Sequence, residues 1–262
     1  MIYNKNKLSI DRLNISNLAK RFNTPLYCYS YKKLSENILS IKKNFKKVNP
    51  LICFAVKSNT NLKILKEIKK FNLGADVVSI GELMKALKAG IKAQKIVFSG
   101  VGKTKTEIEY AINKRILLIN AESKSEILEI ERIAKSKKRK INIGIRLNPN
   151  TDAKTINQIS TGKKENKFGV DEKTFLDLLS YIKKSKNLDL KCLSVHIGSQ
   201  ILNNQPYSKM LSVINKVIKK AKHTFEYIDL GGGIGIDYLH NKNKFNLKKY
   251  SLDIQKFLKK NN

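Results

Sequence analysis

Cysteine is scarce in this sequence, and no apolar run approaches the length of a membrane span. The three cysteines, Cys28, Cys53 and Cys192, lie far apart inside apolar stretches, and none forms a Cys-x-x-Cys pair. This pattern is typical of reduced core thiols in a cytoplasmic protein rather than of a metal or disulfide site. Residues 1–20 also lack the apolar segment of a secretory signal. We therefore expect a soluble protein with no membrane partner.

Acidic residues and arginine are scarce as well. The sequence has 21 acidic and 53 basic residues, and the net charge is +32. Of the basic residues, 47 are lysine and 6 are arginine. Such a charge would suit a nucleic-acid partner, but nucleic-acid binders usually use arginine forks, and these lysines are spread over nearly every predicted helix. We interpret them as a solvated surface and expect no nucleic-acid partner. Binding driven by charge is the weaker alternative.

Short apolar runs alternate with longer helical patterns that are studded with lysine, which is the signature of repeated βαβ units. After a lead-in strand at 26–30, strand-like runs occur at 51–56, 75–79, 95–99, 116–120, 141–147, 190–197 and 227–230. Amphipathic helical patterns include 61–71, 80–89, 124–137, 171–184, 207–222 and 247–260. The sequence therefore predicts an α/β fold with a parallel sheet.

The chain has 262 residues, which is near the usual length of one α/β barrel. Its runs give seven core strands, whereas a closed barrel needs eight. We predict one domain over 1–262, a parallel (β/α)8-type TIM barrel without its eighth strand. The longest irregular stretch, 148–167, lies between the fifth strand and its helix, and loops of that length are often functional.

Polar residues stand at the ends of several predicted strands, where the active site of such barrels lies. They are Lys57, Asp76, Arg146, His196, Ser199, Gly231, Gly232 and Gly233. A single lysine at a strand end is usually a solvated rim charge, but five strands contribute here in the same way. We therefore treat this set as the candidate site.

Three parts of this set have side-chain or backbone groups that suit ligand binding. Lys57 follows an apolar strand, so we expect its amine to emerge from a dry interior that favours the neutral, nucleophilic form. His196 fits either a hydrogen-bonded core histidine or a ring that stacks on a bound aromatic group. Gly231 to Gly233 leave N–H groups free to surround an anion. Because GxGxxG spacing is missing, a single phosphate is the expected guest.

Several blocks of the sequence resemble the fold-type III pyridoxal-phosphate-dependent decarboxylases, whose barrel is of the alanine racemase-like kind. The blocks are TPLYCYS, FAVKSNTN, GADVVSIGELMKALKAGI, KIVFSGVGKT, ISTGKKENKFG, HIGSQ and DLGGGIGIDY. They cover almost the whole chain. The ISTG…ENKFG and HIGSQ blocks resemble the diaminopimelate branch of the family rather than the ornithine or arginine branches.

The resemblance implies a role for each candidate residue. Lys57 would bond covalently to pyridoxal 5'-phosphate, and His196 would stack on its ring. Ser199 and the turn formed by Gly231, Gly232 and Gly233 would hold the phosphate, with Gly233 as the main backbone donor. Asp76 and Arg146 would line the cofactor side of the site.

The resemblance also implies a lyase reaction of lysine biosynthesis, in which meso-diaminopimelate, a small amino-acid substrate, loses carbon dioxide and gives L-lysine. The active form would be a homodimer once the family's remaining blocks are supplied. Those blocks are the eighth strand, a glutamate for the pyridine nitrogen, an arginine for the phosphate and a C-terminal β-domain. We therefore expect the chain alone to be inactive or poorly soluble unless a second polypeptide supplies them.

Other functions stay open at this point. The same chemistry would suit ornithine, arginine or carboxynorspermidine as substrate. The chain would otherwise be an inactive remnant, or a protein that only binds the cofactor. One loop also departs from the family pattern, since Ile156, Asn157 and Gln158 stand where a His-Pro segment is usual.

Overall fold

The computed structural model describes residues 2–4, 7–152, 161–162, 168–238 and 245–261. The chain divides into two compact units, Met1–Asn49 and Pro50–Asn262. Each unit has its own sheet. That the whole chain is a single domain therefore stays a prediction. Among the described helices, none is long and apolar enough to cross a membrane.

The first unit holds a small antiparallel sheet and two helices. They are β1 (Ile2–Asn4), β2 (Lys7–Ile10), β3 (Leu13–Asn14), α1 (Ile15–Phe22) and α2 (Tyr31–Asn44). This sheet was not predicted from the sequence, and the predicted lead-in strand at 26–30 is wrong. That segment has no regular secondary structure. It ends at Ser30, whose hydroxyl oxygen caps α2 by accepting a hydrogen bond from the Lys33 N–H at 2.9 Å.

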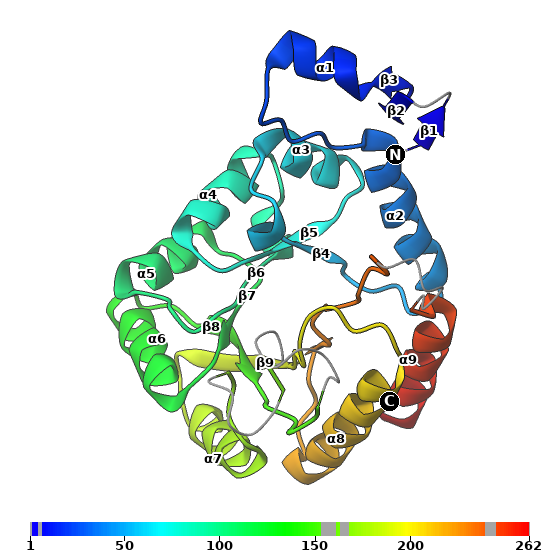
Figure 1. Cartoon of the computed structure of the whole chain (residues 1–262). Helices are drawn as coiled ribbons and strands as arrows, with labels where there is room; N and C mark the ends of the chain where they lie inside the picture. Colours follow the sequence, from blue (N-terminus) through cyan, green and yellow to red (C-terminus); the bar gives the residue numbers. More distant parts are fainter. Residues whose placement is uncertain (1, 5–6, 153–160, 163–167, 239–244, 262) are drawn as a thin grey trace. The chain divides into compact units, whose positions relative to one another are not determined.

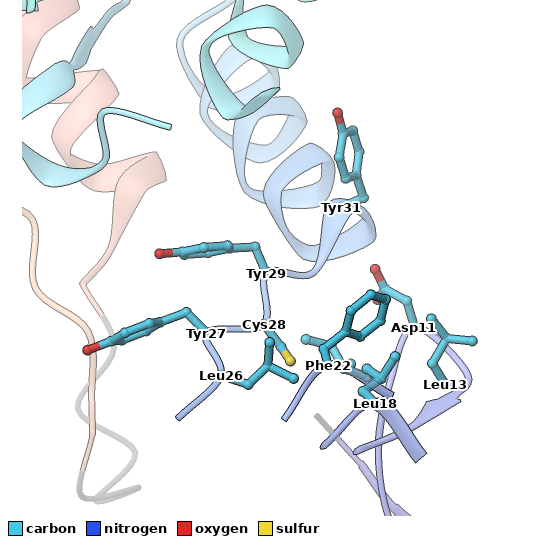
Figure 2. Close-up of a pocket in the computed structure, with 10 residues that line it drawn as sticks. Asp11, Leu13, Leu18, Phe22, Leu26, Tyr27, Cys28, Tyr29 and Tyr31 are labelled. Atoms are coloured by element: carbon cyan, nitrogen blue, oxygen red, sulfur yellow. The ribbon is translucent and has the colours of Figure 1, made fainter. Parts of the chain in front are cut away.

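The apolar residues that suggested a strand at 26–30 line a pocket instead (Figure 2). This pocket has a volume of about 470 Å³, and its lining is mostly aliphatic and aromatic. Tyr27 is 85% exposed beside it. The one carboxylate in the lining, Asp11, already accepts a hydrogen bond from the Ser30 hydroxyl at 2.6 Å. None of the candidate site residues lines this pocket.

The second unit contains a parallel sheet of seven strands in the order β10-β9-β8-β7-β6-β5-β4. The strands are β4 (Cys53–Ala55), β5 (Gly74–Val77), β6 (Ile96–Phe98), β7 (Leu118–Ala121), β8 (Ile141–Arg146), β9 (Leu188–Ser194) and β10 (Tyr227–Asp229). Every neighbouring pair is parallel. The seven strands predicted from the sequence are confirmed, and β4 and β10 form the two edges of the sheet.

Helices follow the strands and lie around the outside of the sheet (Figure 1). They are α3 (Leu62–Lys70), α4 (Ile80–Lys88), α5 (Lys105–Lys114), α6 (Lys124–Ser136), α7 (Glu172–Lys183), α8 (Gln205–Ala221) and α9 (Leu247–Asn261). Successive helices contact one another from α3 to α6 and from α7 to α9. Each presents an apolar face to the core, as α3 does with Ile64, Leu65 and Ile68. Side-chain caps such as Asn61 and Asp171 fix where helices begin.

One glycine inside the sheet makes room for a polar side chain. Gly144 on β8 pairs with Asn120 on β7, and β8 changes register next to it. A Cβ atom at position 144 would lie 2.0 Å from Asn120 Oδ1. Asn120 is 1% exposed, and its amide donates a hydrogen bond to Asp229 Oδ2 on β10 at 2.9 Å. The missing side chain at 144 therefore lets Asn120 reach the far edge strand.

We predict that Gly144→Ala lowers the free energy of unfolding by about 1–3 kcal/mol, because the added methyl displaces the Asn120 amide. Chemical denaturation measures the loss. Gly102→Ala is the matched control, since no atom lies within 4 Å of a Cβ at that position. Equal stability of the two variants would contradict this prediction, because it would show that the Asn120 amide can move aside without loss of free energy of unfolding.

Candidate active site

The candidate residues lie at or just beyond the carboxyl ends of the parallel strands. Asp76 lies on β5 and Arg146 ends β8, while His196 follows β9 and the glycine turn follows β10. Lys57 follows β4 on a short 3-10 helix, η1 (Val56–Ser58). Burial has the largest effect on the pKa of both Asp76, which is raised, and His196, which is lowered, and the positive charge of Lys57 acts on both groups in the lowering direction. The first, second and sixth predicted strands therefore contribute to one electrostatic site.

Lys57 does not lie in the dry interior that we expected. Its neighbour Val56 is fully buried, but Lys57 itself is exposed. Strand β4 ends at Ala55, two residues before Lys57, and the Ser58 hydroxyl closes the following turn by donating to the Ala55 carbonyl at 2.7 Å. Because β4 is also an edge strand, Lys57 is open to solvent. The expectation of a water-poor amine is therefore wrong for this structure.

Asp76 is half-buried, and desolvation raises its pKa to about 6 against the opposing hydrogen bond from Ser99. The negative charge of Asp229 raises the pKa of Asp76 further. The carboxyl ends of the strands thus carry two carboxylates, Asp76 and Asp229, and two cationic side chains, Lys57 and Arg146.

Sequence reasoning missed a buried polar network at these strand ends. Asn120 Nδ2 donates to Asp229 Oδ2 at 2.9 Å and to Ser194 Oγ at 3.3 Å. Ser194 Oγ donates to Asp229 Oδ2 at 3.0 Å. The only signal in the sequence was that Asp229 lies two residues before the glycine turn. Asn120 and Ser194 stand inside apolar strands and gave no signal.

His196 is an uncharged ring at neutral pH. Its pKa is lowered to about 3, first by burial and then by the positive charges of Arg146 and Lys57. Its Nδ1 accepts a hydrogen bond from the Gly232 N–H at 3.2 Å, so the ring proton resides on Nε2. The half-buried neutral ring suits stacking on an aromatic group.

Arg146 is held by a buried ion pair. Its Nη1 lies 2.8 Å from Glu122 Oε1, and its Nη2 donates to the His196 carbonyl at 3.3 Å. Glu122 also accepts the backbone N–H groups of Gly100 and Gly169 at 3.2 and 3.0 Å. Through these bonds the pair ties together the loops after four strands. Arg146 therefore frames the site, in keeping with a supporting role.

The glycine turn has one open face. The Gly231 N–H donates to Asp229 Oδ1 at 2.9 Å, and the Gly232 N–H donates to His196. In the part of the chain that the structure describes, the Gly233 N–H has no acceptor. Gly233 has a φ of +88°, and a Cβ there would lie 1.9 Å from the Gly198 carbonyl oxygen. Only glycine fits this position, and its amide is available for an anion.

Part of the long loop at 148–167 crosses the end of β9. The Thr161 hydroxyl donates to the His196 carbonyl at 2.9 Å, and the Thr161 N–H donates to the Ile197 carbonyl at 3.2 Å. Ser199 is exposed on the loop after His196. The departure from the family pattern at Ile156, Asn157 and Gln158 lies outside the described residues.

The chain is similar to known proteins over most of its length. Residues 31–262 match the family model described as pyridoxal-dependent decarboxylase, pyridoxal binding domain. Diaminopimelate decarboxylase of Helicobacter pylori strain J99 is 45% identical over 244 residues, which are 92% of this chain and 60% of that protein. The enzyme of the same name from Campylobacter jejuni is 41% identical over 92% of this chain and 61% of its own length.

Solved structures agree with these relatives. Helicobacter pylori diaminopimelate decarboxylase in complex with L-lysine superposes with a TM-score of 0.90 at 43% identity and covers 94% of this chain. The enzyme from M. jannaschii, also with L-lysine, has a TM-score of 0.90 at 32% identity. This chain covers 63% and 62% of those two structures. It therefore spans about three fifths of the relatives that it matches.

The lowered pKa of His196 predicts a loss of stability in acid. The unfolded ring titrates near pH 6.5 and the folded ring at about 3, so the unfolded state binds more protons between these values. The contribution of His196 is complete above pH 6.5 and is lost as the pH falls toward 3. His196→Asn keeps an acceptor for Gly232 but does not titrate. Between about pH 7 and about pH 4.5 we expect the wild type to lose about 1–2 kcal/mol more than the variant in urea unfolding. Parallel pH profiles would contradict the assignment.

Proposed function

Since this chain belongs to the pyridoxal-dependent decarboxylase family and carries its pyridoxal binding domain, we propose that it provides the cofactor-binding part of an enzyme that decarboxylates meso-diaminopimelate to L-lysine. The observation that supports this substrate is the 41–45% identity, over 92% of the chain, to relatives named diaminopimelate decarboxylase. The L-lysine in two related structures is the expected product. The activity of the whole enzyme is a proposal because this chain spans about three fifths of those relatives.

Lys57 is the residue that we assign to the covalent bond with the cofactor aldehyde. A primary amine condenses with an aldehyde when it is accessible and loses its proton. The exposed side chain of Lys57 meets the first condition, and within the described residues its amine has no hydrogen-bond acceptor. The carboxylate of Asp76 acts on it from the neighbouring strand.

The remaining candidate residues fit the two ends of pyridoxal phosphate. The open amide of Gly233, with its left-handed φ, is a place for one phosphate oxygen, and the exposed hydroxyl of Ser199 is a second donor. The uncharged ring of His196 offers a flat face for the pyridine ring. Gly231 and Gly232 shape the turn, since their own N–H groups are already bonded.

When bound, pyridoxal phosphate supplies an electron sink for the pair of electrons that carbon dioxide leaves behind. The chain's own residues bind and orient it. Asp76 and Arg146 contribute charge to the site: the positive charge of Lys57 acts on Asp76, and the positive charge of Arg146 adds to burial in lowering the pKa of His196. Because His196 Nδ1 accepts the Gly232 N–H, the ring cannot deliver a proton from that nitrogen.

The proposal includes a cytoplasmic homodimer without a nucleic-acid partner. The thiols of Cys28, Cys53 and Cys192 are free, which fits a reducing compartment. Burial raises the pKa of the Cys53 and Cys192 thiols, so both are unreactive. The dimer is implied by the resemblance to the family.

Borohydride reduction of the protein with pyridoxal phosphate, followed by peptide mapping, tests the assignment of Lys57. We expect label on Lys57 that saturates at low cofactor concentration, because a shaped phosphate site raises the local aldehyde concentration there. Surface lysines should label slowly and without saturation. Lys57→Ala should remove the saturable label and leave the rest unchanged. Saturable label on another lysine would refute the assignment.

The substrate is tested by carbon dioxide release. The chain is mixed with the part of the Helicobacter pylori relative that it does not match, and meso-diaminopimelate, L-ornithine and L-arginine are supplied in turn. We expect release from meso-diaminopimelate, with a loss of at least about 1000-fold for Lys57→Ala, which removes covalent catalysis. Controls are either polypeptide alone. Faster carbon dioxide release from ornithine or arginine would contradict the proposal. The proposal would also be contradicted if a mixture in which Lys57 is labelled released no carbon dioxide from any of the three substrates.

A further inference from the structure

We infer that Asp229 is a positioning residue that holds the glycine turn in its anion-binding conformation. This inference rests on the proposed function, because it takes the ligand of the turn to be the phosphate of the cofactor. In this role Asp229 would raise the affinity of the turn for phosphate.

Both carboxylate oxygens of Asp229 are engaged in hydrogen bonds of different kinds. Oδ1 accepts the N–H of Gly231, two residues along the chain, at 2.9 Å. This bond closes the first step of the turn, where Gly231 has a φ of +66°. Oδ2 accepts from Asn120 Nδ2 at 2.9 Å and from Ser194 Oγ at 3.0 Å. Oδ1 thus binds the turn, and Oδ2 binds two residues of the sheet.

The anchors of Asp229 are themselves rigid. Asn120 and Ser194 are 1% and 4% exposed, and they lie on β7 and β9. Gly144 leaves the space that the Asn120 amide occupies, and Ser194 pairs in register with Asp229. The orientation of the Asn120 amide follows from Asp229, because an anionic carboxylate accepts from Nδ2 and would repel Oδ1. The carboxylate is therefore held by buried groups on two other strands.

The turn that Asp229 holds is tightly packed. A Cβ on Gly231 would lie 2.6 Å from the Val195 carbonyl oxygen, and one on Gly233 would lie 1.9 Å from the Gly198 carbonyl oxygen. With the Gly231 N–H bound to Asp229 and the Gly232 N–H bound to His196, the Gly233 N–H is the amide of the three glycines that is left for a ligand within the described residues. Asp229 therefore acts on the phosphate through Gly231 and not by contact.

The direction in which phosphate affinity changes when Asp229 is replaced distinguishes the positioning role from a simple charge effect. A negative carboxylate next to an anion site weakens anion binding by repulsion, so removing the charge alone should strengthen phosphate binding. Loss of the hydrogen bond to Gly231 lets the turn change conformation, and this should weaken phosphate binding. The positioning role therefore predicts weaker phosphate binding in a variant that has lost a negative charge.

The experiment compares pyridoxal phosphate with pyridoxal, which lacks the phosphate, by their saturable borohydride labelling of Lys57. For Asp229→Ala we expect the Kd of pyridoxal phosphate to rise at least about tenfold and that of pyridoxal to change less than about threefold. Asp229→Asn keeps an acceptor for Gly231 and should lose less than Asp229→Ala. Ser194→Ala removes one anchor and should show a smaller loss in the same direction.

Asp189→Ala is the matched control, because it removes an equal charge from the opposite end of β9. We expect this control to shift neither Kd by more than about twofold. Tighter phosphate binding in both Asp229 variants, or equal weakening of both ligands, would overturn the positioning role while leaving the cofactor assignment intact. If Asp229→Ala does not fold, Asp229→Asn and Ser194→Ala decide by the same comparison. Wild-type protein that binds neither ligand at Lys57 would refute the proposed function, and the inference with it.

Discussion

The parallel pairing of the seven strands is the constraint on which the site depends. Because every strand runs in the same direction, residues far apart in the chain end at one edge of the sheet. The register then sets Arg146, Ser194 and Asp229 at one level across β8, β9 and β10. The glycine turn begins just beyond that level, next to His196. A slip of β10 against β9 would separate Asp229 from both Asn120 and Ser194.

Much of this fold could be predicted from local patterns. Strands β5 to β9 are mostly buried, so each appears as an apolar run. Helices such as α3 and α7 begin at residues whose side chains cap them. The segment 26–30 shows the limit of such patterns. Its apolar and aromatic residues have the composition of a strand, but a strand also needs a partner backbone, and composition does not report one.

The candidate site was predictable in its members but not in its surroundings. Strand ends identify Lys57, His196 and the glycine turn because topology alone brings them together. The exposure of Lys57 depends on where β4 stops and on its place at the edge of the sheet. The bond from Asn120 to Asp229 joins residues 109 apart in the chain. Inside an apolar run a polar residue gives no sign of such a partner.

The central claim is that the carboxyl ends of the strands bind both ends of pyridoxal phosphate, with Lys57 at the aldehyde and the glycine turn at the phosphate. A crystal structure of the chain grown with the cofactor tests this claim most directly. The account predicts continuous electron density from Lys57 Nζ to the cofactor and a phosphate oxygen within hydrogen-bond distance of the Gly233 N–H. Cofactor density at another lysine, or a phosphate away from the turn, would contradict it.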